Sequence, residues 1–174
     1  MYAQQIDEAY NQKIREYTTD KKFLPASVLN LIQDPKIPSP LKHFGQIIGA
    51  PGVMHRTEEI YNYYKQLAQS SPYLQMKQVG TTEKGRPINL IIIGTEEALR
   101  EVEKNKQQLS LLADPRKAAL LDVEQIISTT KPVFYLNAGL HSTEMGSPEM
   151  LMELAYRLVT GNSADIRNIR DKLL

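Results

Sequence analysis

The sequence predicts an α/β fold in which apolar strands alternate with amphipathic helices. Two apolar segments, Pro87–Ile93 (PINLIII) and Val133–Ala138 (VFYLNA), have the length and composition of strands. Apolar residues at helical spacing follow Thr57 and Ser147, and both of these residues can cap a helix. We therefore expect a sheet flanked by helices.

The composition fits one globular domain and restricts its chemistry. The 174 residues are 41% hydrophobic and 24% charged, which is ordinary for a domain with a sizeable core. The 21 Lys and Arg nearly balance the 20 Asp and Glu, and no basic cluster or long apolar run occurs, so we expect neither a nucleic-acid nor a membrane partner. The absence of cysteine excludes disulfides, thiol nucleophiles and Cys-ligated zinc, which leaves His and carboxylates as metal ligands.

Residues 1–54 are predicted to form an N-terminal arm that packs on the rest of the chain. A short helix is expected near Ile6–Tyr17, and prolines interrupt the remainder at Pro25, Pro35, Pro38, Pro40 and Pro51. Ala3-Gln4 suits the position just after a signal-peptidase cut. We therefore expect a secreted or periplasmic protein.

A helix and two strands are predicted between Thr57 and Ile93. Thr57 is the expected cap of a helix over Thr57–Gln69, with Glu58 and Glu59 at the positive end of its dipole. A strand over Met76–Val79 and a turn over Gly80–Arg86 follow. The unbroken apolar end of Pro87–Ile93 predicts a central strand that is buried on both faces.

Residues 95–130 are predicted to be a helical insertion between two strands. One helix carries an apolar stripe, and Asp114-Pro115 suits the cap and first position of a second helix. Because its charges are mixed, we interpret the insertion as a solvated helical cover.

The next strand, Val133–Ala138, is followed by a loop and a well-marked helix. Ser147 is the expected cap, Pro148 the first residue, and Gly161 the end of this helix. The predicted buried stripe consists of Met150, Leu151, Leu154, Ala155, Leu158 and Val159. Glu149 is explained by the helix dipole alone.

His141 and Glu144 lie in this strand-to-helix loop, and two interpretations of them are open. Ligands gather at the carboxyl ends of strands in open α/β sheets, and a His nitrogen and a carboxylate oxygen both bind Zn²⁺. Glycines at 139 and 146 let the backbone bend sharply between them. The alternative is an exposed polar pair without a metal. His43 and His55 have no ligand-like spacing, and we expect both to be ordinary surface or packing residues.

The order of these segments resembles the N-terminal half of the catalytic domain of the M14 zinc carboxypeptidase family. The resemblance rests on HRTEEI from His55, GTTEKGRPI from Gly80 and GLHSTE from Gly139, and it extends to Arg170. The first fifty residues resemble the lead-in of bacterial secreted members. Arg86 matches a motif position, where we expect it to fix the turn.

The resemblance implies a partial carboxypeptidase-like mixed sheet over residues 55–174 and a zinc-dependent carboxypeptidase. His141 and Glu144 would be its first two protein ligands to Zn²⁺, and peptide or protein C-termini its substrates. Pancreatic-type members carry an arginine where this chain has Thr143, so their substrate preference is not carried over. The family's second histidine ligand, its general-base glutamate and its substrate-binding residues lie well downstream of the H-x-x-E motif.

We therefore expect an N-terminal fragment, truncated before the later strands, that contains no catalytic residue and is inactive alone. An exposed strand edge in such a fragment predicts self-association. Two alternatives are a related zinc amidohydrolase that acts on small acylated amino acids and a non-catalytic binding module. The binding module would use Tyr61, Tyr63, Tyr64 and Tyr73 as a partner surface, although packing is the simpler role for these tyrosines.

Overall fold

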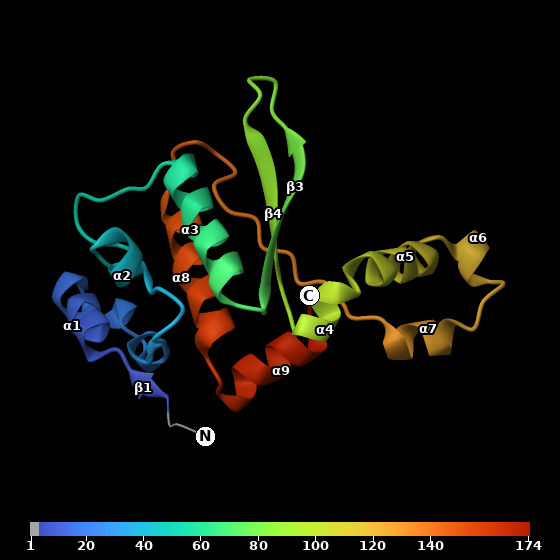
Figure 1. Cartoon of the computed structure of the whole chain (residues 1–174), viewed down its shortest axis with the longest axis horizontal. Helices are drawn as coiled ribbons and strands as arrows, with labels where there is room; N and C mark the ends of the chain where they lie inside the picture. Colours follow the sequence, from blue (N-terminus) through green and yellow to red (C-terminus); the bar gives the residue numbers. More distant parts are fainter. Residues whose placement is uncertain (1–3) are drawn as a thin grey trace.

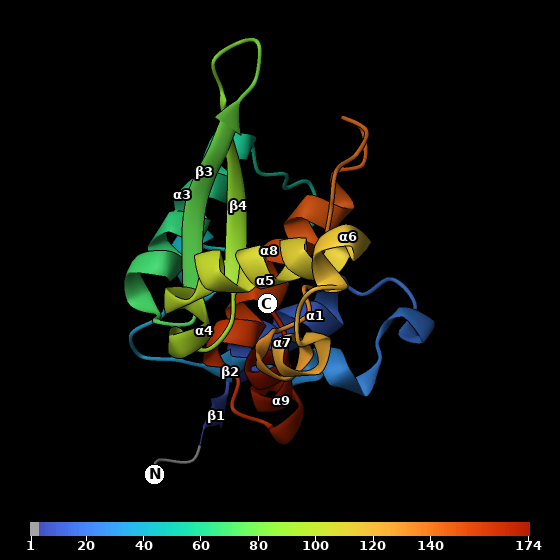
Figure 2. The same ribbon diagram turned by 90° about the vertical axis from the view of Figure 1, so that its right-hand side faces the viewer.

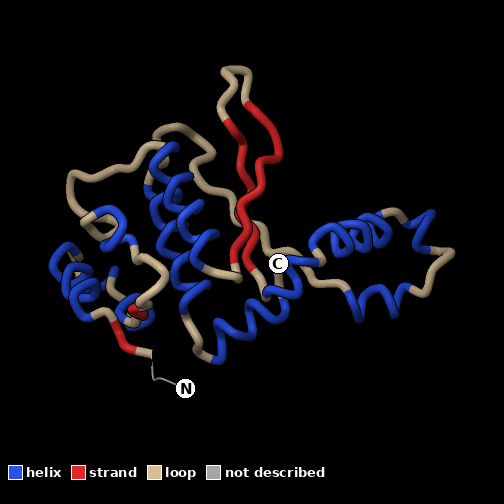
Figure 3. The backbone as a smooth tube through the Cα atoms, in the orientation of Figure 1, coloured by secondary structure: helices blue, strands red, loops and turns tan. Residues whose placement is uncertain are grey.

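The computed structural model describes residues 4–174, so Met1–Ala3, including the Ala3 of the predicted cleavage site, lie outside the described residues. Figure 1 shows a central pair of helices, α3 (Thr57–Ser70) and α8 (Gly146–Thr160). Helices of the N-terminal arm pack on one side of this pair, and a β-hairpin lies on the other side. Beyond the hairpin, a helical arm projects away from the molecule (Figures 1 and 3). The predicted α/β class is confirmed.

The N-terminal arm consists of short elements. They are β1 (Gln5–Ile6), α1 (Glu8–Tyr17), the 3-10 helices η1 (Lys21–Phe23) and η2 (Ala26–Leu29), β2 (Ile32–Gln33) and α2 (Pro40–Phe44). β1 and β2 form a small antiparallel sheet. The predicted helix is confirmed and begins at Glu8, because the Asp7 carboxylate caps it by accepting a hydrogen bond from the backbone N–H of Tyr10 at 3.0 Å.

Helix α3 is present as predicted, but the prediction of Thr57 as its cap is wrong. Arg56 occupies the cap position, and its backbone N–H donates to the Glu59 carboxylate at 2.7 Å. Thr57 is the first helical residue. The Glu59 carboxylate therefore satisfies the Arg56 N–H at this end of the helix. The Thr57 hydroxyl, which was expected to cap the helix, does not occupy the cap position.

The hairpin joins β3 (Leu74–Thr81) to β4 (Pro87–Ile93) in antiparallel register. The turn between them is closed by the backbone of Arg86, whose N–H donates to the Thr82 hydroxyl and whose carbonyl accepts from the Thr82 N–H. The prediction that β4 is central and buried on both faces is wrong. Within residues 4–174, β4 is paired with β3 alone, and most of its residues are only half-buried.

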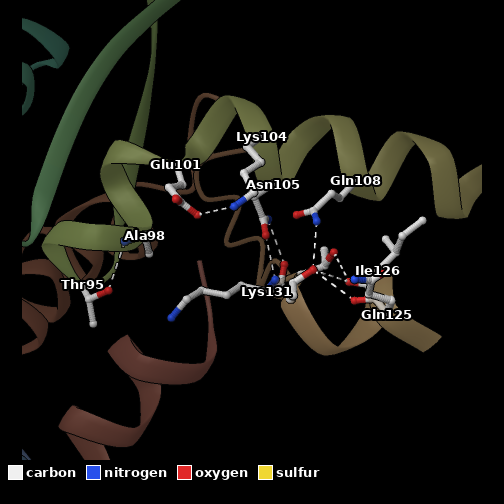
Figure 4. A network of polar contacts seen from close by, with 11 residues as sticks. Thr95, Ala98, Glu101, Lys104, Asn105, Gln108, Gln125, Ile126 and Lys131 are labelled. Carbon is white, nitrogen blue, oxygen red and sulfur yellow. Dashed lines mark hydrogen bonds and ion pairs between the residues drawn. The ribbon is translucent and has the colours of Figure 1, made fainter. Parts of the chain in front are cut away.

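The predicted helical insertion is confirmed as helical, in four pieces rather than two. They are α4 (Glu96–Arg100), α5 (Val102–Ala113), α6 (Pro115–Ala118) and α7 (Val123–Thr129). Asp114 caps α6 and Pro115 is its first residue, as predicted. At the base of the insertion, buried Asn105 donates to the Lys131 carbonyl at 2.9 Å and accepts from the Lys131 N–H at 2.7 Å (Figure 4).

The predicted strand over Val133–Ala138 does not form in the described structure. The segment is extended and largely exposed, with Phe134 67% and Tyr135 70% accessible. Its one backbone contact of ladder type is with Leu174, which accepts from the Phe134 N–H and donates to the Pro132 carbonyl. Apolar and β-branched composition favours a strand, but a strand also requires a neighbour along its length.

Helix α8 runs from Gly146 to Thr160 with Gly161 as its C-cap residue, as predicted for that end, and it is followed by α9 (Ala164–Lys172). The prediction of Ser147 as its cap is wrong by two positions, because Met145 is the cap residue. The predicted stripe is partly wrong as well. Ala155 and Val159 are buried, but Met150 is 49% exposed and the helix also buries Met152, Tyr156 and Thr160.

The buried residues of α8 differ from the predicted stripe because the helix packs on two sides. Met152 and Tyr156 are directed to the N-terminal arm, and they share one core cluster with Tyr10, Leu31, Ile37, Ile47, Tyr63, Leu67 and Leu74. Leu151, Leu154 and Leu158, on another side of the helix, line an apolar cavity of about 780 Å³ that is also bordered by β4, α5 and residues 133–138. The described helices include none with the length and apolarity needed to cross a membrane.

Candidate metal centre

His141 and Glu144 meet in the turn that leads into α8. The Nδ1 atom of His141 lies 2.6 Å from Oε1 of Glu144, and the Glu144 N–H donates to the His141 carbonyl at 3.0 Å. Both side chains are accessible, with exposed fractions of 70% and 53%. A nitrogen and a carboxylate oxygen that can bind a metal therefore converge on one exposed point.

The turn is held against the first turn of α8 by its glycine. Gly139 has φ +68°, and its N–H donates to the Ser147 hydroxyl at 3.3 Å. A Cβ at this position would approach Cγ of Pro148 to 2.9 Å. Both the left-handed backbone and the close approach to Pro148 favour glycine here. The position of His141 and Glu144 thus depends on the start of α8.

The donor set fits half of a zinc site. Tetrahedral Zn²⁺ with N and O ligands at about 2.0–2.2 Å places those two atoms about 3.4 Å apart, so the hydrogen-bonded pair has to open by less than about 1 Å. A structural or catalytic zinc takes at least three protein ligands. Within residues 4–174, no group of three or more His, Cys, Asp or Glu side chains is placed to hold a metal.

A second His–Glu pair lies at the same end of the molecule and was not predicted. His55 and Glu149 are buried, with exposed fractions of 4% and 8%. The Glu149 carboxylate accepts from the His55 backbone N–H at 2.7 Å, and its other oxygen lies 2.8 Å from His55 Nδ1. The prediction that the helix dipole alone explains Glu149 is therefore wrong. His55 is a packing residue, as expected, and it also has a specific polar partner.

No signal in a single sequence pairs these two residues, which are 94 positions apart. His55 precedes α3, and Glu149 lies in the first turn of α8. The two helices start at the same end of the central pair, which Figures 1 and 2 show from two directions. Only the packing of α3 on α8 brings the pair together.

An aromatic cluster packs against His55 on the side of α2. The Phe44 ring lies 4.0 Å from the His55 ring, and His43 and Tyr63 surround Phe44. Partial burial, followed by the charge of His55, lowers the pKa of His43. Within the described part of the chain, His43 belongs to no group of three or more side chains that could hold a metal.

The tyrosines considered as a partner surface are mainly packing residues. Tyr63 is inaccessible and Tyr64 is 8% exposed, and both belong to the core cluster. Tyr61 and Tyr73 are half-buried against that cluster. These four residues therefore do not form an exposed aromatic patch, which removes the observation that favoured a binding module.

A comparison with protein families gives one match. The family model described as zinc carboxypeptidase matches residues 60–174, which is about two thirds of the chain and includes the turn with His141 and Glu144. Neither the search of curated proteins nor the search of solved structures gave a match.

Proposed function

The chain belongs to the M14 zinc carboxypeptidase family, and on that premise we propose that it forms part of a zinc enzyme that hydrolyses the C-terminal residue from peptides. The observation that supports the proposal is the convergence of His141 Nδ1 and Glu144 Oε1 at 2.6 Å in an exposed turn. An accessible pair of donors suits a substrate as large as a peptide, since its chain end has to reach the metal. Residues 55–174 would be the catalytic part, and residues 1–54 the arm that packs on it.

We propose that His141 and Glu144 are two of the protein ligands to zinc. When bound in such a site, zinc polarises the scissile carbonyl and lowers the pKa of its water to about 7. His141 would bind through Nδ1, the nitrogen that faces Glu144, in the neutral tautomer that carries its proton on Nε2 and leaves the lone pair on Nδ1. The carboxylate of Glu144 would partly neutralise the charge of the ion. Within residues 4–174 no third side chain is placed to complete the site, and we therefore expect no peptidase activity from these residues by themselves.

Calorimetric titration of Zn²⁺ into the chain tests the ligand assignment. We expect weak binding that is lost in His141→Ala and kept in His43→Ala, a matched control at an exposed histidine of α2. Equal heats from all three proteins would reject the assignment. Tight stoichiometric binding by the wild type, lost in His141→Ala, would mean that a third ligand lies within the chain.

Two further features of the protein are proposed. Secretion or periplasmic location is supported by the resemblance of the N-terminal arm to secreted members of the family. Fractionation of cells that express the complete gene tests it, and recovery of the protein from the cytoplasm alone would contradict it. Self-association of the chain is supported by the exposed apolar segment Val133–Leu136.

A further inference from the structure

The buried His55–Glu149 pair is connected to the metal-binding turn through a series of short contacts. Glu149 lies in the first turn of α8, one residue after Pro148 and two after Ser147. Ser147 and Pro148 are the residues that contact Gly139, from which the His141–Glu144 turn begins. His55, at the other end of the series, is fixed between Phe44 and the start of α3.

The His55–Glu149 pair has more polar contacts than a residue that only fills space in the core would need. Burying a carboxylate is unfavourable unless its oxygens are paired, and both oxygens of Glu149 contact His55. One oxygen accepts from the backbone N–H at 2.7 Å, and the other lies 2.8 Å from the ring. An apolar residue at position 149 would be buried without this cost. The polar pair fixes one orientation of the first turn of α8.

We infer that His55 and Glu149 are positioning residues of the metal centre: their buried contact sets the start of α8, which sets the place of His141 and Glu144. Partners that orient metal ligands without touching the metal commonly change metal affinity by about 10- to 100-fold when they are removed. The expected change in zinc affinity rests on the proposed function, in which His141 and Glu144 bind zinc. The effect on the turn itself does not depend on any metal.

Glu153 provides a matched control one turn later on the same helix. Its carboxylate accepts from the Tyr10 hydroxyl at 2.7 Å and from Arg157 Nε at 2.8 Å, so it also connects α8 to the N-terminal arm. Within residues 4–174 its polar contacts are with Tyr10 and Arg157, and neither of these residues holds the turn. Glu149→Gln and Glu153→Gln are therefore alike in size and in charge change, and each weakens a carboxylate contact between α8 and another segment, but only the first is expected to alter the turn.

The first measurement is amide hydrogen exchange by NMR in the metal-free chain, at Gly139 and Glu144. We expect Glu149→Gln and His55→Ala to speed exchange at both amides by about tenfold or more, because the first replaces the carboxylate oxygen that faces the His55 ring with an amide NH2 and the second removes the ring. Glu153→Gln should leave both rates unchanged. His55→Asn, which keeps a side-chain N–H donor near the position of Nδ1, should restore most of the protection and serves as the second variant if Glu149→Gln does not fold.

The second measurement is zinc affinity, followed by NMR at the His141 ring. Glu149→Gln should weaken binding by about tenfold or more, and Glu153→Gln should match the wild type. Equal effects of Glu149→Gln and Glu153→Gln on the two amides, or no effect of Glu149→Gln, would overturn the inference. A wild-type chain that binds no zinc would contradict the proposed function, and hydrogen exchange would then decide the positioning role by itself.

Discussion

Tyr156 is the residue that connects α8 to the N-terminal arm through its hydroxyl. The side chain is 1% exposed, and its hydroxyl donates to the Ile32 carbonyl at 2.8 Å and accepts from the Asp34 N–H at 3.2 Å. Burial raises the pKa of Tyr156 above its usual value, so the hydroxyl stays neutral and remains a donor at physiological pH.

Tyr156→Phe is expected to lower the free energy of unfolding by about 1–3 kcal/mol, because it leaves two backbone groups without a partner. Urea denaturation followed by circular dichroism measures the change. Tyr135→Phe is the matched control, since Tyr135 is 70% exposed and its hydroxyl is free to bind water. A loss of equal size in both variants would show that the hydroxyl of Tyr156 contributes nothing specific.

At the scale of elements, the junction of α8 and α9 depends on the space at Gly161. A Cβ at this position would approach Cδ1 of Ile166 to 2.3 Å and the Arg157 carbonyl oxygen to 2.8 Å. The Ile166 side chain can rotate away, but the helix carbonyl cannot. The Gly161 carbonyl also accepts from buried Arg170, whose guanidinium lies over the Tyr73 ring. The glycine therefore allows α9 to turn back so that Arg170 reaches Tyr73, the residue before β3.

Gly161→Ala is expected to destabilise the chain by about 1–3 kcal/mol through this overlap. Gly146→Ala is the control, because a Cβ at Gly146 meets nothing within 4 Å and alanine favours the helix that begins there. Thermal unfolding should show a lower Tm for the first variant and an unchanged or slightly higher Tm for the second. The reverse order would contradict the packing of α9 described above.

The same scale explains why the strand over Val133–Ala138 and the burial of β4 were predicted wrongly. Both segments have the apolar composition of buried strands. In the described chain, β4 has one partner strand, and the 133–138 segment borders the cavity beside it without a ladder. Composition indicates that a segment suits a sheet, but hydrogen-bonding partners along its length decide whether the sheet forms.

At the scale of the molecule, the exposed segment Val133–Leu136 is where the proposed self-association would occur. Its four apolar side chains are between 46% and 70% exposed and lie beside the cavity bordered by β4. Exposed apolar residues next to a strand with a free edge favour pairing with another chain. A second copy that covers the segment would also remove the apolar surface of the cavity from water.

Sedimentation velocity over a range of concentrations tests this proposal. We expect the wild type to shift towards larger species as concentration rises, and Phe134→Lys to remain at the smaller one, because a charge in the contact opposes burial. Leu120→Lys is the control: Leu120 is 86% exposed on the projecting helical arm, away from the segment. A monomeric wild type at every concentration, or an equal effect of both substitutions, would reject the segment as the interface.

The sequence by itself determined the α/β class, the main helices, the hairpin and the family, because these follow from local periodicity and from motifs within short segments. It also identified His141 and Glu144 as the candidate zinc ligands, since two residues three positions apart in one turn suffice to define the motif. The tertiary structure alone decided the two packed sides of α8, the partial exposure of β4 and the pairing of His55 with Glu149. Each of these depends on contacts between residues far apart in the chain, and local sequence carries no information about which distant segments will supply them.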